Sequence, residues 1–189
     1  MDGVSSVLAA FGLSASAGLN AYIPLLAVAL LARFTDLIQL KAPWDGITNW
    51  WIIGILIFLS VIEFVADKIP AVDHVNDVIM TLVRPAAGAI VFAASTSVIE
   101  VNTVFAMAMG LLVAGSVHAV KASARPVVTV STGGTGNALV SLAEDTVSTA
   151  VSVVSILWPY VAAFFVLLGF FLMILWLVRR NKKHSGVEV

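Results

Sequence analysis

Long uncharged segments are the feature that most constrains the fold of this chain. Residues 3–32 contain no charged side chain, and neither do residues 157–178. About 20 consecutive apolar residues are enough for a helix to cross the hydrocarbon core of a membrane. Inside that core every backbone amide must be bonded within the protein, which a helix achieves by itself. The chain is therefore predicted to be an all-α, polytopic membrane protein.

The composition supports a single transmembrane domain, predicted over residues 1–180. Of the 189 residues, 60% are hydrophobic and 11% are charged, whereas a soluble domain carries about 25% charged residues. The length accommodates about six spans. The formal net charge of -1 argues against a nucleic-acid partner. Without cysteine, disulfides and thiolate metal sites are excluded.

Some of the predicted spans are short or broken. They are expected near residues 3–32, 49–66, 86–99, 101–120, 127–143 and 157–178. Gly18 and Pro24 interrupt the first, and a break is expected between them because proline removes a backbone donor. Residues 86–99 are short for a full crossing, and residues 127–143 are weakly hydrophobic. The sequence leaves open whether these two segments span the membrane or re-enter it.

A short interfacial helix is predicted near residues 71–83. Pro70 suits the first turn of a helix. Apolar residues then recur at helical spacing, at Val72, Val75, Ile79, Leu82 and Val83. Polar side chains occupy the remaining surface, and this pattern is typical of a helix that lies in the membrane interface.

Positive charge predicts the orientation. Four basic residues follow the last span: Arg179, Arg180, Lys182 and Lys183. A basic run beside a span favours the cytoplasmic side, so residues 181–189 are predicted to form a basic cytoplasmic tail. With six spans, the N terminus is also predicted to be cytoplasmic, and Glu144 and Asp145 are predicted to form an outer loop.

Ionisable residues gather after the second predicted span. Glu63 and Asp67 are four residues apart and therefore share one helix face. Asp73 and Asp77 have the same spacing on the next helix, with His74 beside them. A turn between the two pairs would bring four carboxylates and an imidazole together. Such a group would suit a divalent cation or a proton relay.

A solvated helix is the competing interpretation of this cluster. Glu63 lies deepest in the predicted span, where lipid penalises charge. For this residue neither the functional site nor the solvated helix is preferred. For Asp73, His74 and Asp77, surface exposure is favoured. Glu63 and Asp67 are therefore candidate ion-path residues. The other three are candidates for a vestibule or a metal site.

Two asparagines lie in similar, small-residue surroundings. The matching stretches are Ser14-x-x-Ala17-x-x-Asn20-Ala21 and Ser131-x-x-Gly134-x-x-Asn137-Ala138. Paired, glycine-interrupted segments point to a transporter binding site, which makes Asn20 and Asn137 candidate substrate-path residues. The alternative is a structural hydrogen bond between helices, contributing about 0.6 kcal/mol.

Three cations are candidate contacts for a lipid headgroup or another anion. Lys121 and Arg125 lie four residues apart, on the same helix stripe as His118. Arg84 ends the predicted interfacial helix. Anionic headgroups attract such residues at the cytoplasmic interface. A simple positive-inside anchor is the competing interpretation.

Three stretches are similar to a known family. They are AGLNAYIPLL at residues 17–26, EFVADKIPAVDH at 63–74 and RPAAG at 84–88. They resemble the domain-of-unknown-function 4126 family of small bacterial integral membrane proteins. The resemblance extends over roughly residues 7–178. It implies a multi-pass protein of the bacterial inner (plasma) membrane, and it carries no activity.

The leading functional hypothesis is a transporter or channel-like permease for a small solute or ion, with carboxylates that bind a cation or a proton. The alternative is a non-transporting scaffold or an anionic-lipid-binding protein. Membrane lipids are the expected partners, and small-residue faces would permit a homo-oligomer. An enzyme is not expected, because no nucleophile–base pair is visible. The sequence does not indicate the substrate.

Overall fold

The computed structural model describes residues 2–66, 70–99 and 101–184, without the side chains of residues 70–75, 77, 173 and 176–184. Its helices are α1 (Gly3–Leu19), α2 (Tyr22–Phe34), η1 (Trp44–Thr48), α3 (Trp50–Ala66), α4 (Pro70–Ser95), α5 (Thr103–Thr132), α6 (Asn137–Leu157) and α7 (Pro159–His184). All regular structure in the described ranges is helical. The predicted all-α fold is therefore confirmed.

Length and surface identify a helical membrane protein. Within the described residues, three helices are long and apolar enough to cross a membrane, namely α5, α6 and the Val78–Ser95 part of α4. α1, α2, α3 and the Pro159–Leu172 part of α7 are shorter apolar helices. Large apolar side chains cover the outside of α3, where Trp51 is 83% exposed and Phe58 is 65% exposed. A contiguous apolar surface of this kind is unfavourable in water and suits lipid.

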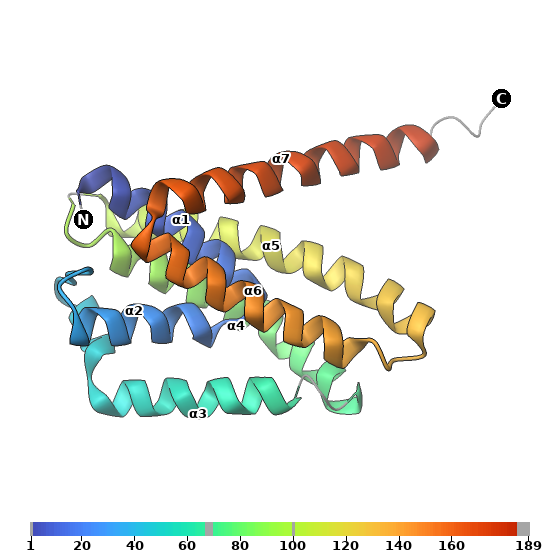
Figure 1. The fold of residues 1–189 in the computed structure, drawn as a ribbon, viewed down its shortest axis with the longest axis horizontal. Coiled ribbons are helices and arrows are strands. Elements are labelled where there is room, and N and C mark those ends of the chain that lie inside the picture. Colours follow the sequence, from blue (N-terminus) through green and yellow to red (C-terminus); the bar gives the residue numbers. More distant parts are fainter. Residues whose placement is uncertain (1, 67–69, 100, 185–189) are drawn as a thin grey trace.

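The first two helices form a hairpin within the bundle (Figure 1). α1 enters from the end at which the chain begins, and α2 returns toward that end after a break near Asn20. α3 to α7 then alternate in direction, so α7 runs toward the opposite end. α1 is the central helix, because it packs against α4, α5, α6 and α7.

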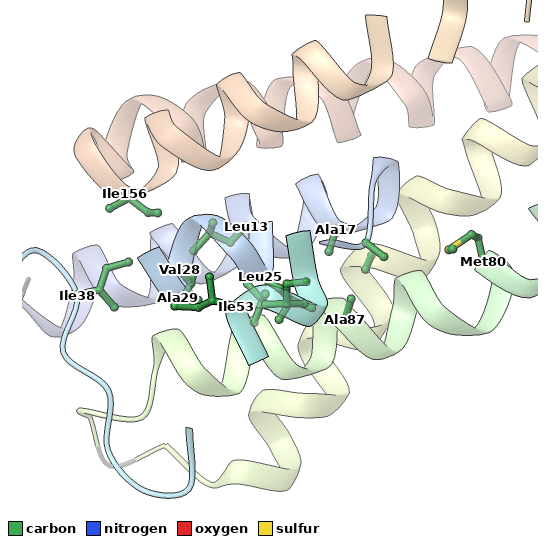
Figure 2. Packing of buried hydrophobic residues seen from close by; sticks show 14 residues of the cluster. Leu13, Ala17, Leu25, Val28, Ala29, Ile38, Ile53, Met80, Ala87 and Ile156 are labelled. Carbon is green, nitrogen blue, oxygen red and sulfur yellow. The ribbon is translucent and has the colours of Figure 1, made fainter. Parts of the chain in front are cut away.

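The apolar core lies around the α1–α2 hairpin. Figure 2 places Leu13 of α1 beside Val28 and Ala29 of α2, with Ile53 of α3 nearby. These side chains are at most 1% exposed. Helices in lipid gain little from the hydrophobic effect and are held by close packing instead. The small and branched side chains of this core permit that packing.

Glycines bring α4 and α5 into close contact. A Cβ at Gly88 would collide with the Ala114 side chain and the Gly110 backbone, and a Cβ at Gly110 would collide with Phe92. Backbones can approach this closely only where side chains are missing, as at small-residue interfaces of membrane helices. α4 and α5 thus form a closely packed pair, and α1 packs against both.

Helix ends differ from the predicted boundaries at two prolines. The helix predicted near residues 71–83 continues through Pro85 to Ser95, so the span predicted at 86–99 is the second half of α4. α5 likewise continues through Pro126 to Thr132, and α6 begins at Asn137, so residues 127–143 are divided between two helices. An interior proline costs about 3 kcal/mol. Tertiary packing offsets it, as where the Pro85 ring lies next to Gly115.

Candidate functional site: an ion-pair layer at the break between α1 and α2

Asn20 forms the break between the first two helices. Its backbone is extended, with φ -138° and ψ 126°, and its N–H donates to the Ser16 carbonyl at the end of α1. Its side-chain oxygen accepts hydrogen bonds from the backbone N–H groups of Tyr22 and Ile23 at 3.0 and 3.1 Å. One residue therefore satisfies backbone groups of both helices. The break expected between Gly18 and Pro24 is present in the structure.

A buried ion pair joins α3 to α4 beside this break. The Arg84 guanidinium donates to Glu63 Oε1 at 3.1 Å, and the two side chains are 0% and 1% exposed. A second nitrogen of Arg84 lies 3.1 Å from Nδ1 of His118 on α5. The His118 Nε2 lies 3.1 Å from the Thr81 hydroxyl. Three helices thus contribute to one polar chain, which is buried at Glu63, Arg84 and His118 and ends at the exposed residue Thr81.

The partners of His118 determine which of its nitrogens carries the hydrogen. Arginine can only donate hydrogen bonds, so Nδ1 must accept from Arg84. The imidazole is then neutral, with its hydrogen on Nε2 and directed at the Thr81 oxygen. A proton on Nδ1 would face the guanidinium and would have to displace it. Protonation of His118 and its bond to Arg84 are therefore mutually exclusive.

A second group of charges lies where α5 meets α6. Lys121 Nζ and an Arg125 guanidinium nitrogen both contact Oε2 of Glu144, at 2.8 and 2.9 Å. Arg125 also donates to the Ser141 hydroxyl at 2.8 Å. Lys121 also donates to the carbonyl oxygen of Leu19, the last residue of α1, at 3.0 Å. This group therefore connects α5 and α6 to the same helix break.

Asparagine and serine side chains connect the hairpin to α6. Asn20 Nδ2 donates to Asp145 Oδ1 at 3.0 Å. One α1 turn before the break, the Ser16 hydroxyl lies 2.8 Å from the Ser148 hydroxyl and 2.7 Å from that of Ser152. All three serines are fully buried. Hydrogen bonds of this kind satisfy polar groups inside the membrane, where lipid chains offer no hydrogen-bond partner.

We call this set of charged and ionisable residues the ion-pair layer: Glu63, Arg84, His118, Lys121, Arg125, Glu144 and Asp145. At a rise of about 1.5 Å per residue, Glu63 lies about 20 Å along α3 from Trp50, and Glu144 about 20 Å along α6 from Leu157. Tryptophans near those helix ends, Trp50 and Trp158, suit a membrane interface. The layer then falls within a hydrocarbon core of about 30 Å.

Among the residues named above, the number of carboxylates equals the number of cations. Three carboxylates, Glu63, Glu144 and Asp145, accompany three cations, Arg84, Lys121 and Arg125. Charge in hydrocarbon is tolerated when it is paired and hydrogen-bonded. Adding or removing one proton would therefore change the charge balance among these six side chains.

Two hollows flank the break on opposite faces of α6. A groove of 610 Å³ lies between α1, α5, α6 and α7, and Lys121 and Glu144 line its mainly apolar wall. A cleft of 360 Å³ lies between α2, α3 and α6, and Asn20 and Asp145 line it. The neighbouring residues Glu144 and Asp145 thus face different hollows.

The structure brings together two of the four predicted path residues. Asn20 forms the break, and Glu63 lies close enough to act electrostatically on Tyr22, the first residue of α2. Asn137 begins α6, where it accepts a hydrogen bond from Thr129, about 12 Å along the helix from Asp145. Asp67 lies outside the described residues. Asn20 and Asn137 each adjoin a helix break, but they occupy different parts of the bundle.

The backbone of the predicted vestibule residues Asp73, His74 and Asp77 belongs to α4, and their side chains lie outside the described part of the structure. Among the described residues, no three histidine, cysteine or acidic side chains gather closely enough to hold a metal ion. The vestibule and metal prediction for those three residues stays a prediction.

The three predicted lipid or anion contacts lie inside the bundle. Arg84, Lys121 and Arg125 are at most 7% exposed, and each contacts a carboxylate. Their surroundings are those of buried cations paired with carboxylates. A contact with lipid stays a prediction for these residues.

The sequence-based placement of Glu144 and Asp145 in an outer loop is wrong. Both lie in the middle of α6, because the preceding weakly apolar segment is divided between two helices. Their role could have been suspected from a serine stripe. Ser141, Ser148, Ser152 and Ser155 recur at helical spacing through the same segment and are all fully buried.

Comparison with known proteins gives one match, which is to a family model. No curated protein and no solved structure matches the chain. A family model described as "Domain of unknown function (DUF4126)" matches residues 7–180. This match covers nearly the whole chain and confirms the family resemblance of the motifs around Asn20, Glu63 and Arg84. The chain belongs to the DUF4126 family.

Proposed function

We propose that this protein is a small, proton-coupled transporter of the bacterial inner membrane. The observation that carries the proposal is the contact of buried Arg84 with both Glu63 and His118 beside a helix break. Ionisable side chains inside a membrane are rare, and they mark ion and proton paths. Broken helices at mid-membrane are typical of transporter binding sites. No enzymatic step forms part of the proposal.

Protonation would act on the link between α3 and the rest of the bundle. α3 packs mainly against α2, and within the described part of the chain the Glu63–Arg84 pair links it to α4. A proton on Glu63 removes the charge that holds Arg84. A proton on His118 removes the second acceptor of the same guanidinium. The first event weakens the hold of α4 on α3 and would let α3 move, whereas the second weakens the contact between α4 and α5.

A two-state movement of this kind is what coupled transport requires. The proton must favour one arrangement of the helices over the other, because a ligand shifts an equilibrium only by its differential affinity. The proposal requires no change in the neighbouring Lys121–Glu144 pair between α5 and α6. Coupling is therefore assigned to Glu63, Arg84 and His118.

Proton flux into proteoliposomes tests this function. The internal pH is followed with a trapped fluorescent dye while small amines, amino acids, sugars and monovalent cations are added in turn. At least one solute should drive proton movement, and Glu63→Gln and His118→Gln should abolish it. Asp45→Asn, at an exposed carboxylate of η1, should leave it unchanged. The function is excluded if no solute moves protons above empty liposomes, or if both layer variants match wild type.

The orientation is a separate part of the proposal. The basic residues after α7 favour a cytoplasmic C-terminal end. α1 begins at the opposite end of the bundle (Figure 1), which favours an external N terminus over the cytoplasmic one expected from six spans. The chain has no cysteine, so Asp36→Cys and Lys183→Cys are unique labels. An impermeant maleimide should label only Asp36→Cys on whole cells; labelling of Lys183→Cys alone would reverse the orientation.

A lipid-binding scaffold is the second candidate, and the 610 Å³ groove favours it. Its apolar wall and the Lys121–Glu144 pair would suit one acyl chain near an anionic headgroup. Mass spectrometry of the purified protein tests this role. A stoichiometric anionic lipid that is lost in Val151→Trp, which would fill the groove, would support the scaffold. Lipid content that is unchanged by this substitution would exclude it.

A further inference from the structure

The 610 Å³ groove between α1, α5, α6 and α7 is apolar over most of its length and polar at one end. On α6 its lining begins at Glu144 and ends at Val154, about 15 Å further along the helix and close to the turn into α7. Lys121 of α5 lies beside Glu144, because the two side chains form an ion pair. Among the described lining residues the third polar side chain is Ser16, whose hydroxyl is engaged by serines of α6.

Glu144 has one carboxylate oxygen that receives no hydrogen bond from the described residues. Lys121 and Arg125 both donate to the other oxygen, Oε2, at 2.8 and 2.9 Å. The side chain is 13% exposed and lines the groove. A carboxylate can accept at both of its oxygens. Inside a membrane lipid chains offer no donor, so an oxygen without one is unfavourable.

The groove therefore needs a hydrogen-bond donor at its polar end and apolar volume elsewhere. The charge of Glu144 is already paired with Lys121 and Arg125. A charged head group at this depth would need a further partner of its own. A plain acyl chain would fill the apolar part but would bring no donor to Glu144. Water would bring a donor, but apolar cavities stay dry.

We propose that the groove binds a lipid alcohol, a neutral molecule with one long apolar chain and a terminal hydroxyl. The hydroxyl donates to Oε1 of Glu144, and the chain lies along Val151 and Phe165 toward the α6–α7 turn. The volume of the groove is within the usual range of small-molecule sites, about 300–1,000 Å³. One molecule thus meets both requirements of the groove.

This inference goes beyond the proposed transport function, because it involves no proton step at Glu63. It uses the same groove as the lipid-binding candidate, but it requires a neutral head group at Glu144 where that candidate has an anionic one. The two occupants can therefore be distinguished by the chemistry of the head group alone.

Photochemical labelling in proteoliposomes tests the proposal. The probe is 1-hexadecanol with a diazirine in the middle of its chain, and mass spectrometry locates the label, which is expected on α6 and α7. Unlabelled 1-hexadecanol and its methyl ether serve as competitors of nearly the same size. The ether keeps the chain and the oxygen but lacks the hydrogen. The alcohol should compete about tenfold better or more, because the ether cannot donate to the charged Glu144.

A matched pair of substitutions tests the place of binding. Val151→Trp fills the groove and should lower labelling several-fold. Val153→Trp is the control, because Val153 is a 38% exposed residue of α6 outside the groove lining, and its labelling should equal that of the wild type. Glu144 itself is kept, since its replacement would leave Lys121 and Arg125 without their shared carboxylate. Unfolding midpoints confirm that both variants are folded.

The outcomes separate the lipid alcohol from the other functions. Equal competition by the alcohol and the ether would overturn the proposal, and so would equal labelling of the two tryptophan variants. Selective labelling without proton flux would support the lipid alcohol and exclude the transporter. Proton-coupled flux without selective labelling would overturn the lipid alcohol and leave the transporter. A stoichiometric anionic phospholipid that 1-hexadecanol fails to displace would also overturn it, in favour of the lipid-binding candidate.

Discussion

The ammonium group of Lys121 on α5 donates a hydrogen bond to the carbonyl oxygen of Leu19, 3.0 Å away, where α1 ends inside the bundle. Carbonyls at a helix C-terminus lack partners within the helix and carry the negative end of its dipole. Water satisfies them at a protein surface, but lipid cannot. Lys121 supplies both the donor and the positive charge, and Glu144 balances that charge. The break in the first segment therefore depends on a residue about a hundred positions later in the chain.

Lys121→Met should lower the stability of the protein markedly. It leaves the Leu19 carbonyl without its lysine donor and removes one of the two cations at Glu144. Breaking a buried ion pair on one side costs about 3–5 kcal/mol. Thermal unfolding in detergent measures the loss. Lys41→Met is the matched control, because Lys41 also donates to a carbonyl, that of Val98, from an exposed position. Equal losses of stability in the two variants would show that the buried contacts of Lys121 do not stabilise the fold more than the exposed contact of Lys41 does.

The Glu63–Arg84 pair should behave as a coupled unit. Arg84→Met leaves a buried carboxylate, and Glu63→Leu leaves a buried guanidinium, so each should cost about 3–5 kcal/mol. In the double variant neither charge remains, and the loss should be clearly smaller than the sum of the single losses. A double-mutant cycle on unfolding midpoints measures this. Strictly additive losses would show that the two side chains do not interact. Arg33→Met, at an exposed arginine that donates to the Thr48 carbonyl and lies over the Trp50 ring, should cost only about 1 kcal/mol.

The helical membrane fold could be predicted from the sequence because lipid imposes it. Apolar segments and the break near Asn20 follow from local composition and from Pro24. Helix boundaries at Pro85 and Pro126 could not be predicted in the same way. Local preference favours an end there, but packing between helices distant in sequence offsets the cost, and a single sequence does not reveal that packing.

The candidate site was predicted only in part. Glu63 could be identified as a candidate because a carboxylate near the end of a membrane span is energetically costly and is usually functional or paired. Its partners Arg84 and His118 come from two other helices, and no local spacing connects them. Glu144 and Asp145 were misplaced because a charged dipeptide after a weakly apolar segment resembles a loop. Charge pairing with Lys121 and Arg125 is what permits them inside the bundle.

Gly88→Ala should destabilise the protein although alanine favours helices. The added methyl group would meet Ala114 and the Gly110 backbone, so α4 and α5 must separate. Overpacking of this kind costs about 1–3 kcal/mol. Gly54→Ala on α3 is the matched control, because nothing lies within 4 Å of its added Cβ. It should be neutral or stabilising by up to about 1 kcal/mol. Unfolding midpoints compare the two, and a stable Gly88→Ala protein would contradict the close α4–α5 contact.

Aspartate in place of asparagine should have opposite effects at two helix caps. Asn102 caps α5 from an exposed position, and its oxygen accepts from Val104 and Phe105 N–H groups at 3.0 and 3.1 Å. Asn20 caps α2 with the same geometry. Aspartate is an equally good cap and interacts favourably with a helix N-terminus, by about 0.3–1 kcal/mol. Asn102→Asp should therefore be neutral or slightly stabilising.

Asn20→Asp should be destabilising, because the amide nitrogen that donates to Asp145 becomes a second carboxylate oxygen at about the same 3.0 Å distance. Two carboxylates this close cannot both stay ionised without a large penalty. The expected loss is about 2 kcal/mol or more, since a buried charge-assisted hydrogen bond is replaced by repulsion. Adding Asp145→Asn to Asn20→Asp restores one amide and one carboxylate and should recover most of the stability. Failure of that rescue would mean that the contact between residues 20 and 145 does not hold the helix break to α6.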